Sequence, residues 1–260
     1  MSEKHKIQTR SLSFSGHDGS QLVASLDFPR DIAPTRYAIM CHCFTCTRQT
    51  LTTSRLCRGL AQAGVAVLRF DFTGLGESEG SFADSHFSSM IGDIECAAEF
   101  LHKHYQAPDY LLGHSMGGTA CLAASQNGSI ALARVSRLVT IASPASPEHV
   151  LHHFGPAMKD LQQGEASEIL VAGQAYPVKP SFISDVEGYD MVLQMQNCHL
   201  PVLAVSAGND ELVGAEAARQ ILQYTQGERK LLEIDQADHL ISDRGHSAQM
   251  ISVVSDWLAS

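Results

Sequence analysis

The sequence predicts an α/β fold with a mostly parallel central sheet and helices on both of its faces. From residue 37 onward, short continuous apolar runs alternate with segments of helical period. Apolar residues make up 44% of the chain and charged residues 18%, which is typical of a globular protein. A chain of 260 residues can form one α/β unit around a large core, so we expect a single domain over residues 1–260.

The predicted elements follow one another along the chain. Alternating residues at Ile7 to Phe14 and Leu22 to Phe28, joined by the turn Gly16 to Gly19, predict an antiparallel edge hairpin. Buried strands are predicted at Tyr37 to Cys41, Val65 to Phe70, Tyr110 to Leu112, Val135 to Ile141, Val202 to Val205 and Leu231 to Ile234. Helices are predicted at Thr53 to Ala63, Phe87 to His104, Gly117 to Gln126, Ala215 to Tyr224 and Ala248 to Leu258.

Residues 143–200 interrupt this alternation. They contain a helical stretch near Glu148 to Gln163, a small hairpin over Ile169 to Val178, and a second helical stretch. The segment is too short to bury a core of its own comfortably. We therefore expect a small inserted cap over the functional edge of the sheet, not a separate domain.

A glycine-flanked serine directly follows the predicted strand at Tyr110 to Leu112. The run Gly113-His114-Ser115-Met116-Gly117 is a G-x-S-x-G pattern, a tight strand-to-helix turn that strains the serine backbone and exposes its hydroxyl. The helix beginning near Met116 points its N-terminal amides at any negative charge that develops there. The pattern alone also fits an ordinary loop, but the apolar strand before it and the Ala-rich helix after it favour Ser115 as a nucleophile.

The ends of later strands supply a carboxylate and a histidine in an informative order. Asp210 follows the strand at Val202 to Val205, and His239 follows the last predicted strand. Because serine needs a base to take its proton, we predict His239 as that base, although a surface histidine is the plainer interpretation. Asp210 is predicted to orient His239 and to stabilise its protonated form.

Other carboxylates compete with Asp210 for the orienting role. Asp238 adjoins His239 in the sequence, so its side chain should point elsewhere. The chain order of nucleophile, acid and histidine favours Asp210. The remaining candidates are Asp235, near the histidine, and Asp185 and Asp190 in the cap.

The loop His42-Cys43-Phe44-Thr45 follows the strand at Tyr37 to Cys41, where a second anion-binding amide is expected. We predict that an oxyanion hole is formed by the backbone amides of Phe44 and Met116. The Phe44 ring can pack against the pocket wall at the same time.

The same loop contains Cys43-Phe44-Thr45-Cys46, a C-x-x-C pattern. A thioredoxin-like role needs this pattern to open a helix, and zinc needs a second ligand pair that the sequence lacks. We expect Cys43 and Cys46 to pack as small apolar side chains. The alternative is a thiol-dependent redox protein that uses these two cysteines. No metal and no organic cofactor is predicted.

The segment Asp71 to Ser78 is rich in turn-forming residues. It lacks the Lys-Ser/Thr of a P-loop and the G-x-G-x-x-G spacing of a dinucleotide site. We predict a tight structural turn beside the site.

Charge and cysteine content limit the partners and the compartment. A formal net charge of −10 argues against nucleic acid and anionic membranes, and no apolar run approaches the length of a bilayer span. A small molecule is the expected partner, and no oligomeric state is indicated. Met1 to Lys6 lacks a secretory signal, and seven irregularly spaced cysteines fit a reducing compartment, so we predict a cytoplasmic protein.

Together these motifs resemble the α/β-hydrolase family over essentially the whole chain. The segments His42 to Cys46 and Leu68 to Gly80 are similar to the hydrolase half of bacterial proteins in which an α/β-hydrolase is fused to an OsmC-type peroxide-reducing domain. The chain ends at Ser260, so we expect no such fused domain here. The elbow and the phenylalanine loop are also similar to feruloyl and cinnamoyl esterases, whose inserted cap shapes the acyl pocket.

The resemblance implies a serine hydrolase that cleaves a small carboxylic ester or thioester through an acyl-enzyme. A binding module that keeps the fold without activity is a further hypothesis. The presence of serine, acid and histidine in the expected order counts against it.

Overall fold

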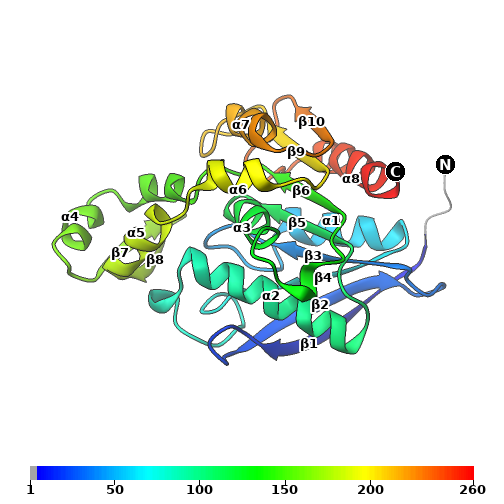
Figure 1. Ribbon diagram of the computed structural model, residues 1–260, viewed down its shortest axis with the longest axis horizontal. Coiled ribbons are helices and arrows are strands. Elements are labelled where there is room, and N and C mark those ends of the chain that lie inside the picture. The colour runs from blue at the N-terminus through cyan, green and yellow to red at the C-terminus, as the bar shows by residue number, and fades with distance from the viewer. Residues whose placement is uncertain (1–4) are drawn as a thin grey trace.

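A computed structural model describes residues 5–260 and contains an eight-stranded mixed sheet, ordered β1-β2-β4-β3-β5-β6-β9-β10 (Figure 1). β1 (Ile7–Ser15) and β2 (Gln21–Pro29) form the predicted antiparallel edge hairpin, and β2 pairs antiparallel with β4 (Val65–Phe70). All other neighbouring strands are parallel, which confirms the predicted fold class. They are β3 (Arg36–Cys41), β5 (Tyr110–His114), β6 (Arg137–Ile141), β9 (Val202–Ala207) and β10 (Arg229–Ile234). Residues 1–4 of the charged N-terminal segment lie outside the described residues.

Helices cover both faces of the sheet, and an apolar core fills each side. Alternate strand residues point to opposite faces, so Ile39 and Cys41 belong to one core and Ala38 and Met40 to the other. On the first side lie α2 (Phe87–His104), α3 (Met116–Ala124) and α7 (Glu216–Tyr224), and on the second α1 (Leu51–Gln62) and α8 (Arg244–Ala259).

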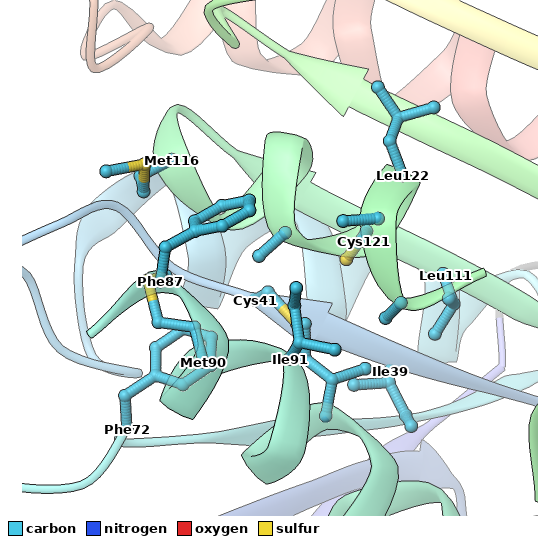
Figure 2. Packing of buried hydrophobic residues seen from close by; sticks show 14 of the residues in the cluster. Ile39, Cys41, Phe72, Phe87, Met90, Ile91, Leu111, Met116, Cys121 and Leu122 are labelled. Atoms are coloured by element: carbon cyan, nitrogen blue, oxygen red, sulfur yellow. The ribbon is translucent and has the colours of Figure 1, made fainter. Parts of the chain in front are cut away.

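The helix that follows the elbow is buried along its whole length. Every residue of α3 is buried, because α3 lies between the sheet and α2, where Phe87 and Ile91 pack near Cys121 (Figure 2). Small side chains, chiefly Ala and Gly, allow this close packing. Across residues 5–260, no helix has the length and apolar character needed to cross a membrane.

The last helix begins earlier than predicted. The Asp243 carboxylate accepts hydrogen bonds from the amides of Gly245 and His246, at 2.7 and 3.0 Å. This N-cap starts α8 at Arg244. The predicted start at Ala248 was too late, because the apolar periodicity on which it was based does not extend back to Asp243.

Residues 143–200 extend from the sheet as a set of short elements, seen in Figure 1 around α4, β7, β8 and α5. The predicted hairpin is present, but the continuous helix predicted near Glu148 to Gln163 is wrong. Gly155, with φ at 41°, and Pro156, which has no N–H to donate, separate two shorter helices. The elements are the 3₁₀ helix η3 (Pro147–Phe154), α4 (Ala157–Gln162), β7 (Ser167–Val171), β8 (Gln174–Val178), α5 (Pro180–Glu187) and α6 (Met191–Asn197).

The insertion shares its core with the rest of the protein. Phe154, Phe182 and Val186 are buried in the same apolar cluster as the residues of α2 and α3. Its outer elements contact the loops at the carboxyl ends of the strands. Two further 3₁₀ turns, η1 (Phe82–Asp84) and η2 (Ile130–Leu132), lie in loops of the main body.

Candidate active site

Ser115 lies between β5 and α3 in the strained conformation that the G-x-S-x-G pattern predicts. Its φ and ψ are 54° and −130°, a conformation that costs a non-glycine residue about 1–3 kcal/mol. Its amide is anchored by a 2.8 Å hydrogen bond to the carbonyl of Ile141. A Cβ at Gly113 would lie 2.3 Å from the carbonyl oxygen of Gly117, and one at Gly117 would lie 2.4 Å from that of His42. Both glycines are therefore required by close backbone contacts.

Asp210 and His239 are brought together from two different strand ends. His239 Nδ1 lies 2.8 Å from Asp210 Oδ2, and the Asp210 side chain is 1% exposed. The other carboxylate oxygen accepts hydrogen bonds from the amides of Leu212 and Val213. Burial raises the pKa of Asp210, but the hydrogen bonds from His239 and these amides outweigh it and leave the pKa lowered. An ionised Asp210 fixes the proton of His239 on Nδ1, so Nε2 of the neutral ring carries the lone pair.

Three of the competing carboxylates have other partners. Asp238 accepts hydrogen bonds from both the amide and the hydroxyl of Ser242. Asp185 accepts from Ser88, and Asp190 caps α6 by accepting from the amide of Leu193. Of these carboxylates, Asp210 is the one that contacts the His239 ring.

The two amides expected to form the oxyanion hole are available for a ligand. Within residues 5–260, neither the N–H of Phe44 nor that of Met116 donates to a protein acceptor. The loop and the helix approach each other closely, because Gly117 lies against the carbonyls of Cys41 and His42. The Phe44 ring also packs on Phe82 and Phe182, with centroids 5.4 and 5.5 Å apart, so it forms part of a wall as well.

His42 fixes the backbone of this loop. Its Nε2 accepts a 3.2 Å hydrogen bond from the amide of Phe72, so its proton lies on Nδ1 and is donated to the carbonyl of Cys43 at 2.8 Å. Burial lowers the pKa of His42, which keeps the ring neutral in this role. The sequence placed His42 in the loop without assigning it this role.

A buried ion pair joins the loop to the neighbouring turn. Asp71 is fully buried and accepts hydrogen bonds from the amide of Arg48, at 2.6 Å, and from the amide of Glu77, at 3.0 Å. The Arg48 guanidinium bridges Asp71 and Glu77. The turn at Asp71 to Ser78 is thus structural, as expected, and it supports the loop that carries Phe44.

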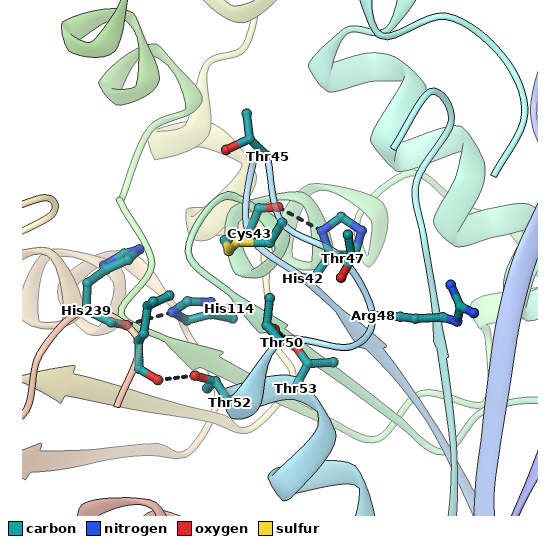
Figure 3. The surroundings of a disulfide bond; sticks show 12 residues. His42, Cys43, Thr45, Thr47, Arg48, Thr50, Thr52, Thr53, His114 and His239 are labelled. Carbon is teal, nitrogen blue, oxygen red and sulfur yellow. Dashed lines mark hydrogen bonds between the residues drawn. A yellow bond between two sulfur atoms is a disulfide. The ribbon is translucent and has the colours of Figure 1, made fainter. Parts of the chain in front are cut away.

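Cys43 and Cys46 form a disulfide, so the expectation that both pack as free side chains is wrong (Figure 3). A turn in which the Cys46 amide donates to the Cys43 carbonyl brings their Cα atoms to 5.2 Å, within the range for a disulfide. The pattern does not open a helix, because α1 begins only at Leu51. The free cysteines among the described residues are Cys41, Cys57, Cys96, Cys121 and Cys198.

Three histidines of η3 lie near the site and were not singled out from the sequence. His149 donates from Nε2 to the carbonyl of Leu212 at 2.7 Å, which ties the insertion to the loop that carries Asp210. Burial and the neighbouring histidines, His239 among them, lower the pKa of His153 to about 4. In the sequence, the close spacing of the histidines at 149, 152 and 153 could have indicated this cluster. Among the described residues, no three His, Cys, Asp or Glu side chains are grouped to hold a metal.

The insertion also closes over the Phe44 loop. The Tyr176 hydroxyl of β8 donates to the carbonyl of Thr45 at 3.1 Å, and its ring packs on Phe82. A cavity of about 20 Å³ lies beneath, lined by Phe44, Phe72, Thr73, Leu75, Phe82, Ser85, His86, Met90 and Phe182. A larger groove of about 690 Å³ runs between α1 and α8, but none of the candidate site residues line it.

The parallel sheet, the serine elbow and the acid and histidine at later strand ends define an α/β-hydrolase. Residues 36–185 match the model of the family described as serine aminopeptidase, S33, and the chain belongs to this family. No curated protein sequence matches the chain closely enough to count as a relative.

Solved structures give a consistent picture. The esterase domain of a Rhodothermus marinus protein is 33% identical, with a TM-score of 0.78, covering 96% of this chain and 97% of that one. Est1E from Butyrivibrio proteoclasticus, solved with ferulic acid bound, is 22% identical, with a TM-score of 0.77 and coverage of 95% and 97%. Mouse α/β-hydrolase domain-containing protein 10 is 18% identical, with a TM-score of 0.75 and coverage of 96% and 98%. The protein is therefore a hydrolase of the serine esterase type, with a small-molecule substrate. The resemblance to OsmC fusions stays a prediction.

Proposed function

We propose that the protein hydrolyses a small carboxylic ester or thioester through an acyl-enzyme, with Ser115 as nucleophile, His239 as base and Asp210 as orienting acid. The observation that carries the proposal is the 2.8 Å contact between His239 Nδ1 and a buried, ionised Asp210. It leaves Nε2 of His239 as the basic nitrogen in a protein whose Ser115 already occupies the strained elbow.

In this mechanism His239 takes the Ser115 proton as the hydroxyl oxygen attacks the acyl carbon. The carbonyl oxygen becomes negatively charged and accepts hydrogen bonds from the amides of Phe44 and Met116, which have no protein acceptor within residues 5–260. His239 then passes its proton to the leaving alcohol or thiol. A water molecule deacylates Ser115 by the same route in reverse, with Asp210 stabilising the imidazolium in both steps.

The surroundings of Phe44 favour an uncharged acyl group. The cavity beside it is lined mainly by aromatic and aliphatic side chains, with no Asp or Glu among them. Side chains of this kind beside the proposed anion-binding loop favour an apolar acyl group over one with a free α-amino group, for which they provide no carboxylate. The ferulic acid bound by Est1E has an aromatic ring, and aromatic side chains around Phe44 would suit an acyl group of this kind.

The insertion at residues 143–200 acts as a cap within a single domain, because it packs on the Phe44 loop through Tyr176 and on the Asp210 loop through His149. The cytoplasmic location stays a prediction. The free cysteines fit it, whereas a disulfide such as Cys43–Cys46 is rare in a reducing compartment.

The proposal is tested by labelling the protein with a fluorophosphonate and mapping the modified peptide, with Ser115→Ala as the matched control. We expect label on Ser115 only, together with turnover of a p-nitrophenyl ester and not of an aminoacyl p-nitroanilide. Label on another residue, or none in a protein that turns over esters, would refute the assignment. Turnover of the anilide would instead support a peptidase.

A further inference from the structure

Two buried side chains hold the main chain of the His239 loop. His114 Nε2 lies 2.8 Å from the carbonyl oxygen of His239, and the Thr52 hydroxyl donates to the carbonyl of Leu240 (Figure 3). His114 comes from the elbow itself and Thr52 from the first turn of α1. Their exposed fractions are 0% and 1%. Two separate elements thus fix consecutive carbonyls at the residue that carries the proposed base.

The hydrogen bond defines the state of the His114 ring. A carbonyl oxygen can only accept, so the proton of neutral His114 lies on Nε2. Its Nδ1 is buried and has no partner within the described residues. Burial, reinforced by neighbouring His239, lowers the pKa of His114 to about 3. His114 therefore stays uncharged beside His239, whose ring centroid is 4.9 Å away, and does not oppose protonation of that ring.

The loop needs such support because its backbone is unusual. Gln236 and Ile241, on either side of His239, have φ of 60° and 46°, in the left-handed region that favours glycine. A main chain in this region persists only where its surroundings hold it. Asn209, adjacent to Asp210, donates its amide to the carbonyl of Ala237 at 2.8 Å. The His114 and Thr52 bonds fix the following carbonyls.

We propose that His114, assisted by Thr52, is a positioning residue for catalysis: its Nε2–H holds the His239 main chain so that the imidazole stays on Asp210 and in place to take the proton of Ser115. This inference rests on the proposed function and adds to it. Asp210 fixes the rotation of the ring and its tautomer, whereas His114 fixes the backbone from which the ring extends. A displacement of about 1 Å in such a group can lower turnover by up to about 100-fold.

The test compares three variants with the parent protein. His114→Phe keeps an aromatic ring and removes the donor, whereas His114→Gln restores an amide N–H the same number of bonds from the main chain. Tyr110→Phe is the matched control, since it removes a buried 2.8 Å bond from another side chain of β5 to a carbonyl, that of Leu258. Each is measured for kcat and KM on a p-nitrophenyl ester, for its rate of fluorophosphonate labelling, and for thermal unfolding.

We expect His114→Phe to lower kcat and the labelling rate by about 10- to 100-fold with KM changed less than about twofold. His114→Gln should recover to within about threefold of the parent, and Tyr110→Phe should keep parent kcat despite a similar loss in melting temperature. Equal kcat in His114→Phe and the parent, or equal losses in His114→Phe and Tyr110→Phe, would overturn the inference.

If His114→Phe does not fold, Thr52→Val takes its place, because it removes the second donor with little change in volume. A kcat equal to that of the parent in this variant would contradict the proposal, and a severalfold fall with unchanged KM would support it. The labelling distinguishes the two proposals. No label on Ser115 in the parent refutes the acyl-enzyme mechanism, whereas equal labelling of parent and His114→Phe refutes only the role of His114.

Discussion

The sheet and the insertion contribute to the site in different ways. Ser115, Asp210 and His239 extend from strand ends and are held by main-chain hydrogen bonds, buried ion pairs and glycine contacts. The insertion reaches the site through side chains, chiefly Tyr176 on the Phe44 loop and His149 on the Asp210 loop. The proposed catalytic groups therefore extend from rigid elements, whereas the segment proposed to select a substrate depends on contacts that single substitutions can change.

The largest loss of activity is expected for Ser115→Ala, at the end of strand β5. Without the hydroxyl no acyl-enzyme can form, so kcat on short p-nitrophenyl esters should fall by about 10⁴-fold or more. The fold should remain, since the hydroxyl is not among the groups that hold the elbow, and circular dichroism and thermal unfolding provide the check. Near-parent turnover in this variant would remove Ser115 from the mechanism.

The next largest loss of activity is expected for only one of two carboxylates, Asp210 and not Asp238. Asp210→Asn should lower kcat by about 10⁴-fold, because the amide cannot hold His239 in the required tautomer. Asp238→Asn is the control, as Asp238 bonds Ser242 and not the His239 ring, and it should keep most of the activity. Steady-state kinetics on both variants settle the assignment. A reversed result would move the orienting role to Asp238 and leave Ser115 and His239 in place.

A smaller effect is expected for the disulfide that spans Phe44. Replacing Cys43 and Cys46 together by serine should leave esterase activity within about tenfold of the parent, since the proposed donor is a backbone amide that His42 also helps to fix. Ester turnover and peroxide reduction are measured side by side. Loss of a peroxide-reducing activity with ester hydrolysis unchanged would favour the thiol-redox alternative.

The smallest effect is expected in the insertion. Tyr176→Phe removes the hydrogen bond to the Thr45 carbonyl and keeps the ring against Phe82, so KM should rise about threefold while kcat changes little. Ser184→Ala, in the same insertion, is a control that breaks only a local bond to Ser181. A large fall in kcat for Tyr176→Phe would show that the insertion also affects the chemical step. It would contradict the division of roles between the sheet and the insertion.

Sequence patterns predicted the sheet and the elbow because each has a local signature, and the chain order of nucleophile, acid and histidine predicted the pairing of Asp210 with His239. The strands appear in the sequence as continuous apolar runs. Ser115 lies between glycines, because close backbone contacts leave no room for side chains at those positions. The break in the insertion at Gly155 and Pro156 was also visible in the residues and was outweighed by the helical period. What could not be predicted depends on the folded geometry, which leaves no local signature in the sequence. The Cys43–Cys46 bond needs a loop geometry, and the contacts of His114 and Thr52 join segments far apart in the chain.

The proposed anion site consists of main-chain atoms from two distant segments, kept together by the absence of a side chain at Gly117. Substituting Phe44 or Met116 by any residue other than proline leaves the N–H in place. An alanine scan would therefore not detect either donor, because it keeps both N–H groups and changes only the shape of the wall around them. Side-chain changes at positions 44 and 116 would therefore alter the apolar wall in which both side chains pack and leave the two proposed donors in place.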